Sequence, residues 1–271
     1  MSSAIHAERL ARVRAALTAQ GLDGFVVPIS DEHMSEYVGD YAQRMAWLTG
    51  FGGSAGTAAV LPEKAAVFID GRYTVQVRDQ VDGSLFDYVG VPQSSVGEWL
   101  GANVSAGQKI GFDPWLHGID WARSLGRALT AKGAQLVAVD KNPLDAAWDD
   151  QPVPSAAPVA VHDVALAGQS AVDKREVIAD WLKANGLDTT VMTALDSIAW
   201  TFNIRGSDVS HTPVGLAFAL LHADATADLF IAPEKVTDAV RAHLGNSVRI
   251  HDRDAFEAAL ADLKDKKVAL D

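Results

Sequence analysis

The chain has 271 residues, of which 48% are hydrophobic and 21% are charged, and its formal net charge at pH 7 is −12. An acidic chain without a basic run lacks the Lys and Arg side chains that neutralise phosphates, so neither nucleic acid nor an anionic membrane surface is an expected partner. The sequence contains no cysteine, which excludes disulfides, thiolate catalysis and Cys-ligated zinc.

The first predicted element is an amphipathic helix over residues 7–20. Leu10, Val13 and Leu17 recur at helical spacing, and Gly21 is a typical helix end. This segment has no apolar core of the kind found in signal peptides, and no run of 18 apolar residues occurs along the chain. The sequence therefore predicts a cytoplasmic location and no membrane partner.

Strands and helices alternate after this helix. Short apolar runs bounded by turn residues predict strands over 24–29, 58–62, 65–70, 109–113 and 134–140. Helices are predicted over 73–81, after the "DGR" turn, and over 120–133, which ends in glycine. This alternation is typical of an α/β fold, with a sheet covered by helices.

A proline-rich stretch interrupts the pattern. The segment "PVPSAAP" at 152–158 has three prolines in seven residues and no hydrophobic periodicity. Such composition is typical of an interdomain linker. We therefore expect a first domain over 1–150, a linker over 151–165 and a second domain over 166–271.

The second half of the chain repeats the first. A helix is predicted over 173–186, and four further stretches, 186–195, 198–206, 227–244 and 266–271, match 21–30, 45–53, 66–81 and 108–113 in the same order. This order predicts two copies of one fold, although any two αβ units share some likeness. The first copy continues with a helix and a strand after its last matched stretch. The second copy is therefore expected to be C-terminally incomplete.

Few residues suggest chemistry within this chain. The eight histidines are scattered and form no H-E-x-x-H motif, so no metal site is expected. Ser54 lies between glycines but lacks the spacing of a nucleophile elbow, and no base can be named beside it. A catalytic role for this serine is not expected.

The stretch "GFGGSAGT", residues 50–57, has four glycines and needs its own explanation. A Walker A loop requires a lysine directly after its last glycine, but the first lysine here is Lys64. A Rossmann loop leads into a helix, whereas the residues that follow favour strands. We expect instead a glycine turn that leads into a β-hairpin, where glycine permits positive φ and close backbone approach.

Two long stretches carry a resemblance to a known family. Residues 31–73, which contain "GFGGSAGT" and "DGRY", resemble the creatinase-type N-terminal domain of three-domain Xaa-Pro aminopeptidases. Residues 195–221, which contain "NIRGSDV", resemble the second domain of the same enzymes. The resemblance covers nearly the whole chain. It implies two tandem copies of a creatinase N-terminal-like mixed β-sheet with flanking helices, the second copy truncated.

The resemblance also implies a function for a longer parent protein. In that family a third domain, of the pita-bread type, binds two divalent metals, usually manganese, through two Asp, one His and two Glu. The metals activate a hydroxide that removes the N-terminal residue before a proline. None of that domain lies within 1–271, so this chain is expected to hold no metal ligand and no catalytic residue. Its expected partners are the catalytic domain, peptides with proline at the second position, and a second subunit.

Two alternatives remain open at this point. The parent could be an Xaa-Pro dipeptidase or a creatinase, although those relatives usually have one N-terminal domain of this type. The chain could also be a stand-alone scaffold protein that keeps the fold without the chemistry.

By the same resemblance, these domains wall the active-site cleft and contribute to dimer contacts. The candidate residues for substrate access or interface contact are Asp31, His33, Glu36, Arg44, Asp70, Arg72 and Tyr73. Asp70 and Arg72 have a simpler alternative role, in which they fix a turn and Asp70 caps the following helix. A loop hydrogen bond is the simpler role for His33. Arg205 and Asp208 are expected to form an ion pair within the second domain.

The tryptophans are expected to be structural. Trp47 and Trp200 occupy matching positions in the repeat and are predicted to lie on apolar strands in the core. The others are expected to pack against helices or the linker: Trp99, Trp115, Trp121, Trp148 and Trp181.

Overall fold

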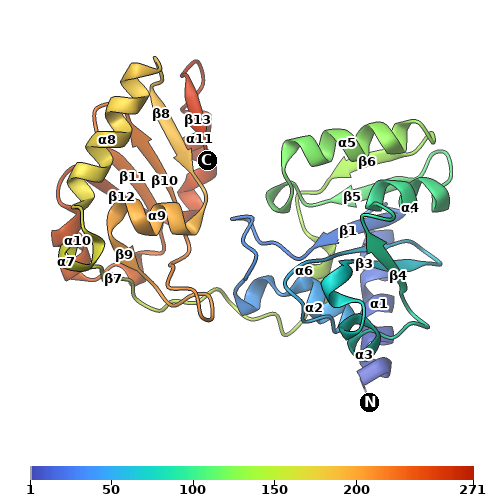
Figure 1. The fold of residues 1–271 in the computed structure, drawn as a ribbon. Coiled ribbons are helices and arrows are strands. Elements are labelled where there is room, and N and C mark those ends of the chain that lie inside the picture. The colour runs from blue at the N-terminus through green and yellow to red at the C-terminus, as the bar shows by residue number, and fades with distance from the viewer. Residues whose placement is uncertain (1) are drawn as a thin grey trace. The chain divides into compact units, whose positions relative to one another are not determined.

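The computed structural model describes residues 2–271 and divides the chain into two compact units, Met1–Val153 and Pro154–Asp271 (Figure 1). Each unit has its own sheet and its own buried core. Among the described residues, no helix combines the length and hydropathy needed to cross a membrane.

The first unit is built on a mixed six-stranded sheet. Its strands are β1 (Gly24–Pro28), β2 (Thr57–Val60), β3 (Ala65–Asp70), β4 (Asp87–Val91), β5 (Lys109–Phe112) and β6 (Gln135–Ala138). Their order is β4-β3-β2-β1-β5-β6. β1–β2 and β2–β3 are antiparallel pairs, and the remaining pairs are parallel. The predicted hairpin after the glycine stretch is confirmed as β2 and β3.

Helices cover both faces of this sheet (Figure 1). One core contains side chains of α1 (Ser2–Ala19), α2 (Arg44–Thr49), α3 (Gln76–Gln80) and α6 (Pro143–Ala147). The opposite core contains side chains of α4 (Val96–Asn103) and α5 (Ile119–Thr130). Neighbouring strand residues alternate between the two cores: Val27 faces the first and Val26 the second, as the pleat requires.

The first helix shows how the sequence pattern produces this packing. Leu10, Val13 and Leu17, at i, i+3 and i+7, are each at most 3% exposed, because this spacing places them on one side of a helix. Gly21 follows with a φ of +68°, which glycine adopts without a Cβ penalty. The predicted helix is confirmed.

The second unit repeats the architecture. Its main strands are β8 (Thr189–Met192), β10 (Ala217–His222), β11 (Ala227–Ile231), β12 (Val248–His251) and β13 (Val268–Leu270). The order β12-β11-β10-β8-β13 has the same sequence of antiparallel and parallel pairs as β4-β3-β2-β1-β5. The predicted duplication of one mixed α/β fold is confirmed. In the described part of the chain, no strand of this second sheet corresponds to β6.

The helices of the second unit are α7 (Val164–Ala167), α8 (Ala171–Ala184), α9 (Leu195–Phe202), α10 (Asp238–Leu244) and α11 (Phe256–Ala261). α8, α9 and α10 bury side chains against one face of the sheet, and α11 packs on the other. The stretch expected to be a linker contains β7 (Ala160–Val161), which pairs with β9 (Ile204–Arg205). Val159, 2% exposed, belongs to the core of the second unit.

The tryptophan prediction was partly wrong. Trp47 and Trp200 lie on helices, α2 and α9, rather than on strands. Trp47 is buried and stacks on Trp148 with ring centroids 5.3 Å apart. Trp200 is 47% exposed, because Ile198 and Phe202 occupy the buried side of α9 and Trp200, two residues from each, points away from it.

The predicted ion pair between Arg205 and Asp208 was also wrong. Asp208 is buried and pairs instead with the buried Lys235, while it also accepts a hydrogen bond from the backbone N–H of Leu216 at 2.6 Å. Arg205 Nη1 donates to the carbonyl oxygens of Ala199, at 2.9 Å, and Ile204, at 2.8 Å. The Ala199 carbonyl lies in the last turn of α9, where a cation is favourable, and the Ile204 carbonyl lies on β9 just after it.

Candidate functional site

The seven candidate side chains lie in the first unit and form two groups. The outer group is Glu36, Asp70, Arg72 and Tyr73, and the inner group is Asp31, His33 and Arg44. The outer side chains reach the surface, whereas the three inner residues are at most 8% exposed.

Ser54, in the glycine stretch, links two members of the outer group, Glu36 and Tyr73. Its hydroxyl donates to Glu36 Oε1 at 2.8 Å and lies 3.0 Å from the Tyr73 hydroxyl oxygen. Its backbone N–H donates to the same tyrosine oxygen at 3.1 Å. These bonds to Ser54 lower the pKa of Tyr73. Sequence reasoning missed this role because Glu36 and Tyr73 are 18 and 19 residues away from Ser54.

Asp70 and Arg72 bind each other at the turn after β3. Asp70 Oδ1 accepts from the Arg72 backbone N–H at 2.9 Å, and its two oxygens accept from Nε and Nη2 of the guanidinium at 2.6 to 3.1 Å. These bonds lower the pKa of Asp70 and raise the pKa of Arg72. The guanidinium carbon lies 5.2 Å from the Tyr73 ring centroid. Asp70 thus fixes the 3₁₀ turn Gly71–Tyr73 and, through Arg72, the surroundings of the tyrosine.

The glycines of residues 50–57 allow the backbone conformation and the close packing of this surface. Gly50 ends α2 with a φ of +82°. A Cβ on Gly53 would lie 2.3 Å from Phe51 Cζ and 2.9 Å from Tyr73 Cδ1. A side chain at this position therefore has no room, and the tyrosine packs directly against the backbone. The expectation of a glycine turn with close backbone approach is confirmed.

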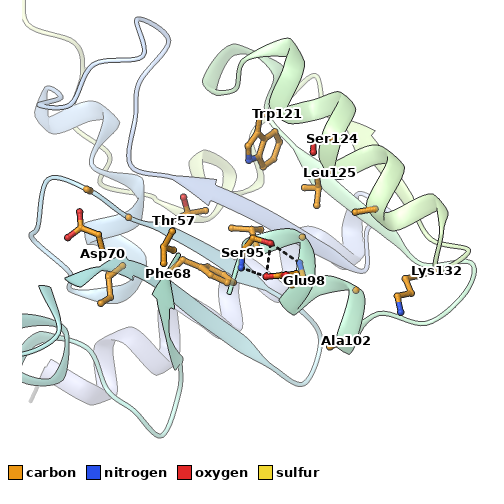
Figure 2. Close-up of a pocket in the computed structure, with 18 residues that line it drawn as sticks. Thr57, Phe68, Asp70, Ser95, Glu98, Ala102, Trp121, Ser124, Leu125 and Lys132 are labelled. Atoms are coloured by element: carbon orange, nitrogen blue, oxygen red, sulfur yellow. Dashed lines mark hydrogen bonds between the residues drawn. The ribbon is translucent and has the colours of Figure 1, made fainter. Parts of the chain in front are cut away.

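A cavity of about 910 Å³ begins beside Asp70 and residues 55–57 (Figure 2). It lies between the sheet, α4 and α5, and its walls are mainly apolar, with Phe68, Trp121 and Leu125 among them. Figure 2 shows Asp70 at one end and Lys132 at the other. Ser95 and Glu98 bond each other as a capping box, with the Ser95 N–H 2.7 Å from Glu98 Oε2. The cavity therefore suits an apolar group better than a charged one.

Asp31, in the inner group, holds the loop that carries Glu36. Asp31 is fully buried, and its Oδ1 accepts from the backbone N–H groups of His33 and Ser35, each at 3.0 Å. This is an Asx-type turn, in which the carboxylate substitutes for a backbone acceptor. His33 is buried beside Glu32, with Nε2 4.0 Å from Oε1. Both side chains lie beneath the surface, away from solvent.

Arg44 joins two helices rather than facing the outer group. Its Nε and Nη2 donate to the two carboxylate oxygens of Asp145 on α6, at 2.7 and 2.9 Å. Burial opposes the charge of Arg44, but the bonds with Asp145 outweigh it and raise its pKa. Gln151 donates to the same carboxylate at 2.9 Å. Arg44 therefore has a structural partner.

A second polar cluster, in the second unit, was not predicted. Asp228 on β11 accepts from Arg249 at 2.6 and 2.7 Å and lies 2.8 Å from His222 Nε2 and 2.6 Å from His251 Nε2. Burial alone would raise the pKa of Asp228, but these bonds lower it far below its usual range. The cluster lines a cavity of about 800 Å³. Its members lie on three strands, so no local sequence motif predicts the cluster.

No metal centre is evident in the part of the chain that the structure describes. Groups of three or more His, Cys, Asp or Glu side chains that could hold an ion do not occur among residues 2–271. The cluster around Asp228 contains the cation Arg249, which disfavours a further positive charge.

Comparisons with known proteins agree with the duplicated fold. Residues 9–145 and residues 150–271 each match a family model described as the creatinase/prolidase N-terminal domain. A probable Xaa-Pro aminopeptidase P from Aspergillus clavatus is 38% identical over 263 residues, which are 96% of this chain and 40% of that protein. Aminopeptidase P2 of Arabidopsis thaliana is 35% identical over 248 residues, 89% of this chain and 34% of that protein.

A solved structure gives the same picture. The crystal structure of X-prolyl aminopeptidase from Caenorhabditis elegans, described as a cytosolic enzyme with a di-nuclear active site, superposes with a TM-score of 0.91 at 31% identity. The match covers 96% of this chain and 44% of that enzyme. The chain thus spans about 40% of the length of the relatives it matches.

Proposed function

Because the chain belongs to the creatinase/prolidase N-terminal domain family, we propose that it forms the non-catalytic N-terminal part of a metal-dependent Xaa-Pro aminopeptidase. One observation carries this proposal: a single alignment to the Caenorhabditis elegans enzyme covers both units, 96% of the chain. A dipeptidase or creatinase parent with one such domain would leave the second unit unmatched. The same alignment favours an enzyme parent over a stand-alone scaffold.

In this proposal the outer group borders the path of the peptide substrate. Arg72 binds Asp70 through Nε and Nη2, so its Nη1 remains to meet a peptide carbonyl or carboxylate. Asp70 holds the guanidinium in place, and the bonds of Ser54 hold the Tyr73 hydroxyl. Because these side chains are already held in place, they can restrict the access of peptides with little loss of side-chain entropy on binding. The substrates are peptides with proline at the second position.

In this proposal the parent's catalytic domain contains two divalent metals, and manganese is the metal we propose. The described residues of this chain do not fit such a pair, since no His, Asp and Glu cluster can hold an ion. We therefore assign no step of hydrolysis to them. A cytoplasmic location and a homodimer, in which the outer group also contacts the second subunit, belong to the same proposal.

The test of the access role is a pair of arginine variants of the full-length enzyme that this proposal requires. Arg72→Ala should lower kcat/KM for Xaa-Pro peptides about tenfold, the value of one charge-assisted hydrogen bond. Arg78→Ala, at another exposed arginine, on α3, is the matched control and should leave kcat/KM unchanged. Equal kcat/KM for both variants would remove Arg72 from the substrate path.

A further inference from the structure

Three large apolar side chains of the second unit are exposed on two adjoining helices. Val177 and Trp181 on α8 are 59% and 52% exposed, and Trp200 on α9 is 47% exposed. Half-exposed tryptophans are uncommon on free surfaces and are enriched in interfaces, where they often carry much of the binding energy. These side chains are not in the buried core of the unit, and the proposed role in substrate access does not involve them.

Lys174 places Trp200 beside α8. From α8, its Nζ lies 4.3 Å from the Trp200 ring centroid and donates to the Trp200 carbonyl at 3.0 Å. Val177 and Trp181 follow Lys174 by three and seven residues, which places them on the same side of α8. We call Val177, Trp181 and Trp200 the tryptophan patch (α8 and α9 in Figure 1).

Carboxylates lie along one side of the tryptophan patch on α8, and another lies on α9. Asp173, Glu176 and Asp180 are exposed on α8, on the side of Val177 that faces away from the core. Asp196 is exposed on α9, one turn before Trp200. The nearby cations are already engaged. Lys174 is 2% exposed and donates to the Trp200 carbonyl on α9, and Arg205 donates to the Ala199 carbonyl of the same helix. Lys183 Nζ lies 3.1 Å from Asp180, so this carboxylate is already paired, whereas Asp173, Glu176 and Asp196 form no salt bridge with another described residue.

We propose that the tryptophan patch binds a basic amphipathic helix of a separate partner protein. Apolar side chains of such a helix would cover Val177 and the two indole rings, and its Lys and Arg side chains would meet the carboxylates of α8 and α9. Arginine also stacks favourably on tryptophan.

Other occupants fit the charges less well. A second copy of this chain would place two sets of carboxylates against each other, which disfavours association. An anionic lipid surface would be repelled for the same reason. A basic polypeptide is the partner whose charge complements the patch.

A designed helical peptide of leucine and lysine tests this proposal, with a leucine and glutamate peptide as its acidic counterpart. The basic peptide should bind the 271-residue chain saturably, change its tryptophan fluorescence and weaken as salt is raised. The acidic peptide should not bind. Trp181→Ala should weaken binding about tenfold or more. Trp115→Ala is the matched control, since Trp115 is 43% exposed in the first unit, and should bind like the unchanged chain.

A second variant tests the proposal even if Trp181→Ala fails to fold. Glu176→Lys combined with Asp180→Lys changes two exposed positions of α8 and should abolish binding of the basic peptide while leaving the unfolding curve nearly unchanged. Equal binding by the Trp181 and Trp115 variants would overturn the proposal. Two other results would also overturn it: dimerisation of the chain that Trp181→Ala abolishes, or loss of peptide binding in the full-length enzyme.

Discussion

Asp228 and Arg44 illustrate how single charged residues are used in this molecule. Each is buried, and each is neutralised by a partner from a different element: Asp228 by Arg249 on β12, and Arg44 by Asp145 on α6. Removing one member of such a pair leaves an uncompensated charge, which costs more than the pair itself contributes. Stability tests at these residues therefore probe the geometry of each unit directly.

At Asp228 we predict a pH-dependent loss of stability. The folded state lowers the pKa of this carboxylate, so its contribution is fully present above the ordinary Asp value of about 4 and is lost as pH falls below it. Asp228→Asn should lower the free energy of unfolding of the second unit by about 2 kcal/mol at pH 7, and by less at pH 3. Urea unfolding at the two pH values measures this. Glu176→Gln, an exposed control in the middle of α8, should change neither value. An equal loss at both pH values for Asp228→Asn would contradict the account.

At Arg44 we predict a larger effect than at an exposed ion pair. Arg44→Ala should lower the free energy of unfolding by about 3 kcal/mol, because Asp145 loses a bidentate partner. Arg12→Ala removes a pair with Asp149 whose side chains are 36% and 81% exposed, and should cost less than about 1 kcal/mol. Thermal unfolding of both variants compares them. Similar losses would mean that Arg44 does not join α2 to α6.

At the scale of elements, the periodicity of apolar residues was enough to predict the long helices. The sequence predicted α1, α5 and α8, whose apolar residues recur over 12 to 18 residues. In the first unit it missed α2, α4, α6 and β4, and in the second unit it placed Trp200, which lies on α9, on a strand. α2 has six residues, and α4 carries Gly97 and Gly101, which weaken the helical signal. The capping box of Ser95 and Glu98 was the available clue to α4.

The candidate site was predictable only in part for a related reason. Sequence order places Asp70, Arg72 and Tyr73 together, and the structure keeps them together. The direction of Arg44 depends on which side of a six-residue helix it occupies, which the sequence does not determine. The place of Ser54 in the outer group depends on contacts across 18 or more residues.

Replacement of two glycines by alanine should have opposite effects on stability. A Cβ on Gly206, in "NIRGSDV", would lie 2.7 Å from backbone atoms of Gly215 and Val214, so Gly206→Ala should destabilise the second unit by about 2 kcal/mol or more. A Cβ on Gly101 in α4 would meet only Lys132, at 3.5 Å, so Gly101→Ala should stabilise the first unit by about 0.5–1 kcal/mol. Denaturant unfolding distinguishes the two. A stabilising Gly206→Ala would show that the two backbone segments are not in close contact.

At the scale of the whole molecule, the repeated fold accounts for most of the chain. Two units with separate cores and matching strand orders agree with the repeat in the sequence. We propose a domain boundary near Val153, which is 84% exposed. Brief elastase digestion should cut there first and leave two resistant fragments. Early cleavage inside either sheet, with the boundary intact, would contradict this division.

We propose that this chain supplies structure, and not catalysis, to an Xaa-Pro aminopeptidase. The most direct measurement is hydrolysis of an Xaa-Pro peptide by the purified 271-residue chain, with manganese added and then removed, after circular dichroism has shown that the chain is folded. We predict no turnover and no bound manganese under either condition. Manganese-dependent release of the N-terminal residue would place a catalytic metal site within residues 1–271 and contradict the account.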